Sequence, residues 1–203
     1  MKLFIRIPTQ GSVHGALVPW ISWASRTWPT ADISITYTHG YGVAWGRNEI
    51  VREFLSSPCT HLWMIDSDTI PPENTALVDA IGDDVVVAAP YPSFHATRGL
   101  IWNVYRRSSS GYSSLHPNDW PTSESFNVDA AGLGCVIIPR DLLSGIRFKH
   151  RFLPDGTIVG EDFDFFENIG GVTIVPAATC RHGRIVDLLD VHNWHELGSL
   201  VGV

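Results

Sequence analysis

The residues most able to do chemistry in this sequence are the acidic triplet Asp66-Ser67-Asp68. The triplet follows directly on a short apolar run, residues 61–65, which has the composition of a buried strand. Two aspartates separated by one residue in an extended chain can direct both carboxylates to the same side. Mg²⁺ and Mn²⁺ prefer such oxygen ligands and are usually held by one or two carboxylates, together with water and phosphate oxygens. The triplet therefore predicts a divalent-cation site that meets phosphate.

A second pair of acids and a late histidine also have catalytic potential. Glu161 and Asp162 follow Gly160 at the predicted start of a helix, where one carboxylate would complement the free N–H groups and the helix dipole. The other carboxylate is then available as a general base that takes a proton from an attacking hydroxyl. His182 follows the last predicted strand, so it can return to the same edge of the sheet as a neutral nitrogen ligand.

The elements that must position these residues alternate between strand and helix. Apolar or alternating runs predict strands, and apolar residues recurring every three to four positions predict helices. The predicted strands are residues 3–7, 33–37, 61–65, 85–89, 130–138 and 172–175; the predicted helices are residues 13–23, 48–55 and 139–143, one from Pro71 and one from Gly160. This order predicts an α/β domain, in which ligands bind at the carboxyl ends of the strands. The acidic triplet lies at such an end.

Residues 93–127 interrupt this alternation. They have no consistent periodicity, and they include the turn-rich stretches Ser108-Ser109-Ser110-Gly111 and His116-Pro117-Asn118-Asp119. We expect residues 93–127 to form a long excursion on the substrate side of the domain. A mobile surface insertion is the alternative, because long loops without secondary structure are either functional or disordered.

Composition and charge narrow the class of protein. The 203 residues fit one domain, 1–203, and an apolar content of 44% fits a folded globular chain. The formal charge is −7 and no basic run exceeds Arg106-Arg107, so long nucleic acid is not a favoured partner. The three cysteines form no CxxC pair, which indicates neither a zinc site nor a disulfide framework. No apolar run reaches membrane-spanning length and no signal sequence is recognisable, so we expect a cytoplasmic protein.

An ordered set of motifs over most of residues 2–184 resembles a known family. The motifs are Ile7-Pro8-Thr9, Gly46-Arg47-Asn48, the strand leading into Asp66-Ser67-Asp68, Gly132-Leu133-Gly134-Cys135, Gly160-Glu161-Asp162 and Cys180-Arg181-His182. Together they resemble the nucleotide-diphospho-sugar transferases of the GT-A fold, especially the inverting group. The resemblance implies an α/β, three-layer sandwich with a mostly parallel central sheet. It also implies a glycosyltransferase that uses Mn²⁺ or Mg²⁺ and a UDP- or GDP-sugar donor, with an unknown acceptor.

The resemblance also implies roles for single residues. Pro8 and Thr9 would border the nucleoside, and Arg47 would lie near the base or a phosphate. Asp68 would bind the metal directly, whereas Asp66, next to Ser67, would contact ribose or metal-bound water. Asp162, beside Glu161, would be the base, and His182 would be a further metal ligand. Gly132 and Gly134 would leave space for the donor sugar or the acceptor.

Two other interpretations remain open. A strand that leads into Asp66-Ser67-Asp68 also resembles the first motif of haloacid-dehalogenase-type phosphatases, in which Asp66 would be the nucleophile and Asp68 an acid or base. That motif normally opens its domain, whereas two strands and two helices precede it here, and the only lysines are Lys2 and Lys149. The non-enzymatic alternative is a catalytically silent module that binds a nucleotide sugar.

Overall fold

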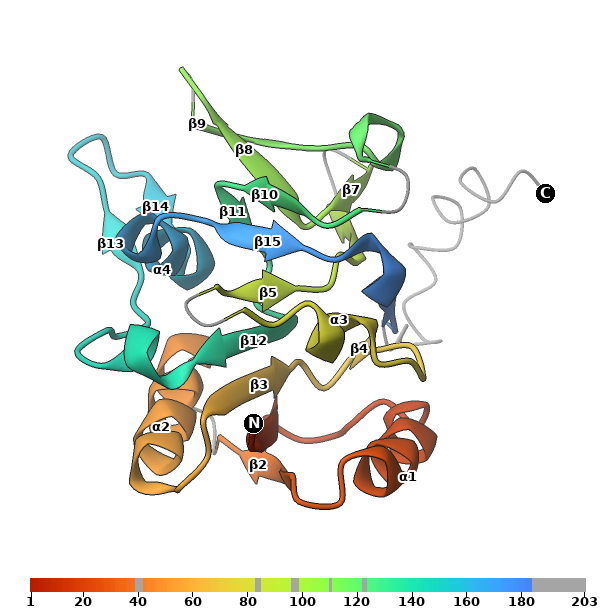
Figure 1. Cartoon of the computed structure of the whole chain (residues 1–203). Helices are drawn as coiled ribbons and strands as arrows, with labels where there is room; N and C mark the ends of the chain where they lie inside the picture. The colour runs from red at the N-terminus through yellow and green to blue at the C-terminus, as the bar shows by residue number, and fades with distance from the viewer. Residues whose placement is uncertain (39–41, 83–84, 96–98, 110, 122–123, 184–203) are drawn as a thin grey trace, which may run out of the picture.

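The computed structural model describes residues 1–38, 42–82, 85–95, 99–109, 111–121 and 124–183 of the chain. Its central feature is a seven-stranded sheet (Figure 1). The strands of this sheet are β1 (Leu3–Thr9), β2 (Asp32–Tyr37), β3 (His61–Ile65), β5 (Val87–Ala88), β10 (Phe126–Val128), β12 (Cys135–Pro139) and β15 (Val172–Ile174). Their order across the sheet is β10-β15-β5-β12-β3-β1-β2.

The sheet is mixed: β1, β2, β3, β5 and β15 run in one direction, and β10 and β12 run against them. β1 pairs in parallel with β2 and β3, and β5 pairs in parallel with β15. β12 lies between β3 and β5 and is antiparallel to both, and β10 is antiparallel to β15. The reason lies in the connection, because the chain reaches β12 through hairpins and not through the helical crossover that a parallel neighbour needs. The first three strands are parallel, so their carboxyl ends share one edge.

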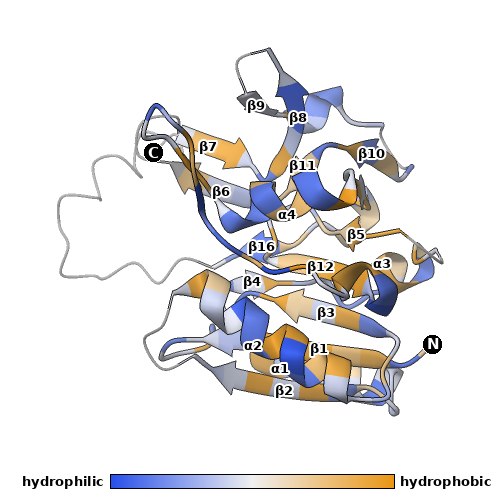
Figure 2. Ribbon diagram, turned by 90° about the vertical axis from the view of Figure 1, so that its left-hand side faces the viewer, coloured by the Kyte–Doolittle hydropathy of each residue, from blue (hydrophilic) through white to orange (hydrophobic). Residues whose placement is uncertain are grey.

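Helices cover both faces of the sheet, so the expected three-layer arrangement is present. α1 (Leu17–Thr27) and α3 (Ala76–Asp79) lie on one face, and α2 (Val43–Ser56) and α4 (Glu161–Ile169) lie on the other (Figure 1). Because side chains alternate along a strand, Leu62 and Met64 of β3 join the core under α2 and α4. Trp63 and Ile65 join the core under α1. Figure 2 shows hydrophobic residues concentrated on the central strands.

Smaller elements surround this sheet. Two of them, β4 (Thr69–Ile70) and β16 (Arg181–His182), pair antiparallel just beyond the acidic triplet. The others are the pair β6 (Pro92–His95) and β7 (Gly99–Trp102), the three-stranded sheet of β8 (Val104–Ser108), β9 (Gly111–Ser114) and β11 (Ala130–Ala131), and the pair β13 (Arg151–Phe152) and β14 (Ile158–Val159). Single 3₁₀ turns span Pro117–Asp119, Arg140–Leu143 and Pro176–Ala178. In the described part of the chain, no helix is long and apolar enough to cross a membrane.

The excursion at residues 93–127 is more regular than the sequence indicates. β6 pairs with β7 and β8 pairs with β9, and β10 joins the edge of the central sheet. Most side chains of β8 and β9 are exposed and polar, so these strands lack the apolar alternation that reveals a strand in a sequence. β6 packs against β16, which places the start of the excursion beside His182.

Candidate functional site

The acidic triplet forms the loop between β3 and β4 at the carboxyl edge of the sheet. The Asp66 N–H donates to the carbonyl of Gly134 at 2.8 Å, and the Thr69 N–H donates to the Asp66 carbonyl at 3.0 Å, which fixes the loop as a tight turn. The triplet borders a cavity of about 290 Å³. The other walls come from the ends of β1 and β2 and the start of α2, as Pro8, Thr9, Gln10, Thr38 and Val43. The triplet and the two residues predicted to border a nucleoside, Pro8 and Thr9, thus line one cavity.

Asp66 belongs to a largely buried ionic network. Nη2 of Arg47 lies 3.0 Å from Oδ1 and 3.2 Å from Oδ2 of Asp66, and Nε of Arg47 lies 3.6 Å from Oε1 of Glu161. Burial disfavours the charge of Arg47, but Asp66 and Glu161 outweigh that effect, so the pKa of Arg47 is raised. In this structure the guanidinium of Arg47 binds protein carboxylates. Its predicted place beside a base or a phosphate stays a prediction. We call Arg47, Asp66 and Glu161 the Arg47 network.

Asp68, the residue after Ser67, lines the same cavity and is more exposed than Asp66. Its Oδ2 lies 3.3 Å from Nε2 of His182, and its side chain is 46% exposed. The hydrogen bond with His182 is the main reason that the pKa of Asp68 is lowered, and the same bond raises the pKa of His182. The backbone holds the pair together, because β16 pairs with β4 and the Gly183 N–H donates to the Asp68 carbonyl at 2.7 Å. We call Asp68 and His182 the open pair.

The open pair offers one carboxylate and one imidazole to a divalent cation. Asp66 does not join them, and among the described residues no group of three or more His, Cys, Asp or Glu side chains is arranged to hold a metal ion. Mn²⁺ and Mg²⁺ usually take only one or two carboxylates and complete their shell with water and phosphate oxygens. The donor set therefore fits such an ion if a bound diphosphate supplies further oxygens. Metal ligation by Asp66, Asp68 and His182 stays a prediction.

The two acids at the start of α4 have different partners. Glu161 faces Arg47 and also lies 3.7 Å from Nδ1 of His150. Asp162 accepts the N–H of Phe163 on its Oδ1 at 2.8 Å, and its Oδ2 has no hydrogen-bond partner among the described residues. Asp162 is not one of the residues that line the cavity beside the acidic triplet. Burial raises the pKa of Asp162, and the neighbouring charge of Glu161 adds to this effect. A carboxylate whose pKa is raised accepts a proton more readily, as a general base must.

Tyr91 is a site residue that the sequence analysis missed. Its hydroxyl accepts the Gly134 N–H at 3.1 Å, and its ring lies 5.4 Å from the ring of His182. A Cβ atom at Gly132 would lie 2.2 Å from the Tyr91 hydroxyl, and one at Gly134 would lie 2.7 Å from it. The space that these glycines leave is therefore filled by Tyr91, where the sequence predicted a donor sugar or acceptor. Tyr91 lies between Pro90 and Pro92, three residues after the end of β5 and directly before β6, a position near a strand end that could have singled it out.

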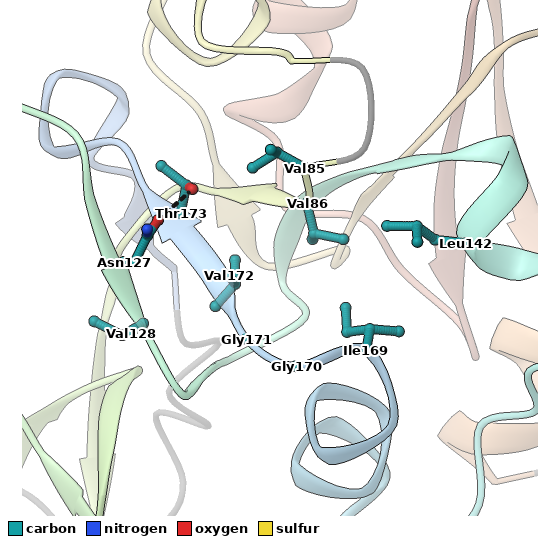
Figure 3. Close-up of a pocket in the computed structure, with 10 residues that line it drawn as sticks. All are labelled: Val85, Val86, Asn127, Val128, Leu142, Ile169, Gly170, Gly171, Val172 and Thr173. Carbon is teal, nitrogen blue, oxygen red and sulfur yellow. Dashed lines mark hydrogen bonds between the residues drawn. The ribbon is translucent and has the colours of Figure 1, made fainter.

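A second cavity of about 330 Å³ lies beside β15 and the end of α4, and it offers a useful contrast (Figure 3). Its lining is mainly Val, Leu, Ile and Gly, and the polar side chains of Asn127 and Thr173 are hydrogen-bonded to each other. None of the residues that line it is acidic, basic or histidine. It therefore has no group suited to phosphate or metal chemistry, in contrast to the cavity beside the acidic triplet.

Comparison with known proteins finds no matching family model and no matching curated protein. Among solved structures, the crystal structure of A197 from STIV is similar to this chain with a TM-score of 0.61 and 26% sequence identity. The match covers 91% of this chain and 86% of that chain. The similarity therefore concerns the whole α/β architecture with its seven-stranded mixed sheet, and not a single motif.

Proposed function

We propose that this chain is a metal-dependent glycosyltransferase of the GT-A type, which transfers a sugar from a UDP- or GDP-sugar to an acceptor hydroxyl. The observation that carries the proposal is the cavity shared by Pro8, Thr9 and the acidic triplet, with the open pair at its side. Ligands of α/β proteins bind at this edge of the sheet. Its volume of about 290 Å³ suits a nucleoside and leaves the diphosphate to extend towards Asp68.

The chain's own residues would divide the work as follows. Pro8 and Thr9 would bind the nucleoside, and Asp68 and His182 would hold a divalent cation. That cation, when bound, supplies positive charge that stabilises the departing diphosphate. Asp162 would take the proton of the acceptor hydroxyl on its free carboxylate oxygen, which would lead to inversion at the anomeric carbon.

The geometry favours this function over a phosphatase. A nucleophilic aspartate needs a free carboxylate oxygen, whereas both oxygens of Asp66 lie within hydrogen-bonding distance of Arg47. A silent binding module would have no use for a buried carboxylate with a raised pKa at residue 162. Asp162 is therefore the residue that separates an enzyme from a binding module.

The test compares wild type with Asp162→Asn on a panel of UDP- and GDP-sugars in the presence of Mn²⁺. We expect the wild type to release the nucleoside diphosphate from one donor, and the variant to bind that donor with unchanged affinity in isothermal titration. Loss of a general base lowers turnover by roughly 10²- to 10⁴-fold. Equal loss of binding and turnover would reject the role of Asp162, and no turnover by the wild type with any donor and acceptor would reject the enzyme.

A further inference from the structure

His14 lies beside the acidic triplet in the segment between β1 and α1. Its backbone N–H donates to the carbonyl of Ser67 at 2.8 Å, and its carbonyl accepts the Leu17 N–H at 2.9 Å. One end of His14 is thus tied to the turn that carries Asp68 and the other to the first turn of α1. Its position is fixed by backbone contacts and does not depend on its side chain.

The tautomer of His14 follows from its local hydrogen bond. Nδ1 accepts the N–H of Ala16 at 3.2 Å, so Nδ1 carries no proton in the neutral ring. The proton is then on Nε2, which makes that nitrogen a donor and not a metal ligand. Among the described residues, no hydrogen-bond acceptor is paired with Nε2.

A glycine allows the imidazole to reach this place. A Cβ atom at Gly183 would lie 2.5 Å from Cδ2 and 2.7 Å from Nε2 of His14. Gly183 follows His182 and donates its N–H to the Asp68 carbonyl. The His14 ring therefore packs with its face against the backbone of the open pair, so its Nε2–H, which lies in the ring plane, does not point at Gly183.

We infer that the Nε2–H group of His14 donates a hydrogen bond to a diphosphate oxygen of the nucleotide-sugar donor, an inference that rests on the proposed function. A diphosphate that meets a cation at Asp68 carries several negatively charged oxygens, more than one cation can satisfy. His182 already has Asp68 as its partner, whereas Nε2 of His14 still has a hydrogen to donate. A fixed donor beside the departing diphosphate is the arrangement that stabilises developing charge.

Two variants remove this contact by different routes. His14→Asn keeps an oxygen that can accept the Ala16 N–H but lacks a group that reaches as far as Nε2. Gly183→Ala leaves His14 in the chain and displaces its ring, because the new methyl group would overlap it. Gly15→Ala is the matched control, since its Cβ would meet nothing within 4 Å.

The experiment is isothermal titration of each protein with UDP, GDP and inorganic pyrophosphate, each in Mn²⁺. We expect His14→Asn and Gly183→Ala to bind pyrophosphate and the preferred nucleotide about 10- to 100-fold more weakly than wild type, as loss of a hydrogen bond to a charged group predicts. Gly15→Ala should bind as wild type does, and melting curves should show that all variants fold.

The outcomes separate this inference from the proposed function. Wild-type affinity in both His14→Asn and Gly183→Ala would overturn the role of His14 and leave the proposed function intact. Pyrophosphate binding that weakens in both variants, with no preference for a nucleoside diphosphate, would support His14 as a diphosphate ligand and reject the nucleotide-sugar donor. No binding of any of the three compounds by wild type would overturn both.

Discussion

The Arg47 network and the open pair are built on aspartates only one residue apart, yet they differ in almost every physical respect. Asp66 contacts a guanidinium that is 4% exposed, and Asp68 contacts an imidazole that is 23% exposed. The two carboxylates of the network are paired with Arg47, whereas the single carboxylate of the open pair is half-exposed. The difference teaches that one short motif can commit one acid to an ion pair with a buried guanidinium and leave the other accessible to solvent.

The largest expected effect is on the Arg47 network. Arg47→Met should lower the free energy of unfolding by about 3 kcal/mol, because it leaves the carboxylates of Asp66 and Glu161 without their buried partner. Chemical denaturation measures this loss. Arg52→Met on the same helix is the control, because its ion pair with Glu49 is exposed to solvent and should contribute little to stability. Equal losses in the two variants would show that the network does not stabilise the fold.

A smaller loss of stability is expected from a substitution at Gly134, next to the turn that carries both the Arg47 network and the open pair. Gly134→Ala should cost about 2 kcal/mol, because its methyl group would overlap Tyr91 and lie 2.9 Å from Oγ1 of Thr69. Gly82→Ala is the comparison, since its Cβ would make only an ordinary contact with Val85 at 3.5 Å. If Gly134→Ala unfolds at the same denaturant concentration as wild type, the space beside Gly134 is open and available to a substrate after all.

Asp162→Asn should raise stability at neutral pH by less than Gly134→Ala lowers it. The pKa of Asp162 in the folded protein is raised above 3.8, so the folded state binds more protons than the unfolded state between these two pKa values. Stability therefore falls as pH rises through this window, and asparagine removes the penalty. Melting temperatures across pH test this, and a constant difference between variant and wild type from pH 3 to pH 8 would contradict it.

The smallest effect belongs to the open pair. The pKa of His182 is raised above 6.5, so its contribution is present below that pH and is lost as pH rises through the raised value. The pKa of Asp68 is lowered below 3.8, so its contribution is lost only as pH falls through that lower value. His182→Asn should therefore lower stability between these limits by no more than about 1 kcal/mol, because the pair is partly exposed. A larger loss that persists at alkaline pH would assign His182 a structural role.

Parts of the fold that rest on strong local patterns could be predicted from the sequence. The strand at residues 61–65 coincides with β3, because a run of apolar residues has few alternatives to burial. The predicted helix at residues 13–23 instead begins at Leu17, because His14 bonds to the backbone of Ser67, a distant contact that no local pattern reveals. The order β3-β12-β5 was not predicted either, because strand pairing depends on contacts between segments that are distant in the sequence.

The sequence identifies candidate residues for a site, but it does not show how their side chains pair. The sequence picked out Asp66, Asp68, Asp162 and His182 by type and position, and the structure brings Asp68 and His182 together. The sequence could not show that Asp66 binds Arg47, because this ion pair and the burial of Arg47 depend on the packing of α2 against the edge of the sheet. The sequence did not single out Tyr91 or His14, because their positions depend on contacts with distant glycines: Gly132 and Gly134 for Tyr91, and Gly183 for His14.

The measurement that tests the central claim most directly is the thermal shift on adding UDP or GDP with and without Mn²⁺, for wild type, Asp66→Asn and Asp68→Asn. Ligand that binds only the folded state raises its melting temperature. We expect Mn²⁺ to increase the shift of the wild type and to have no effect on that of Asp68→Asn. Asp66→Asn should start from a lower melting temperature and keep a Mn²⁺-dependent shift. A full Mn²⁺-dependent shift in Asp68→Asn, or none in wild type, would contradict the account.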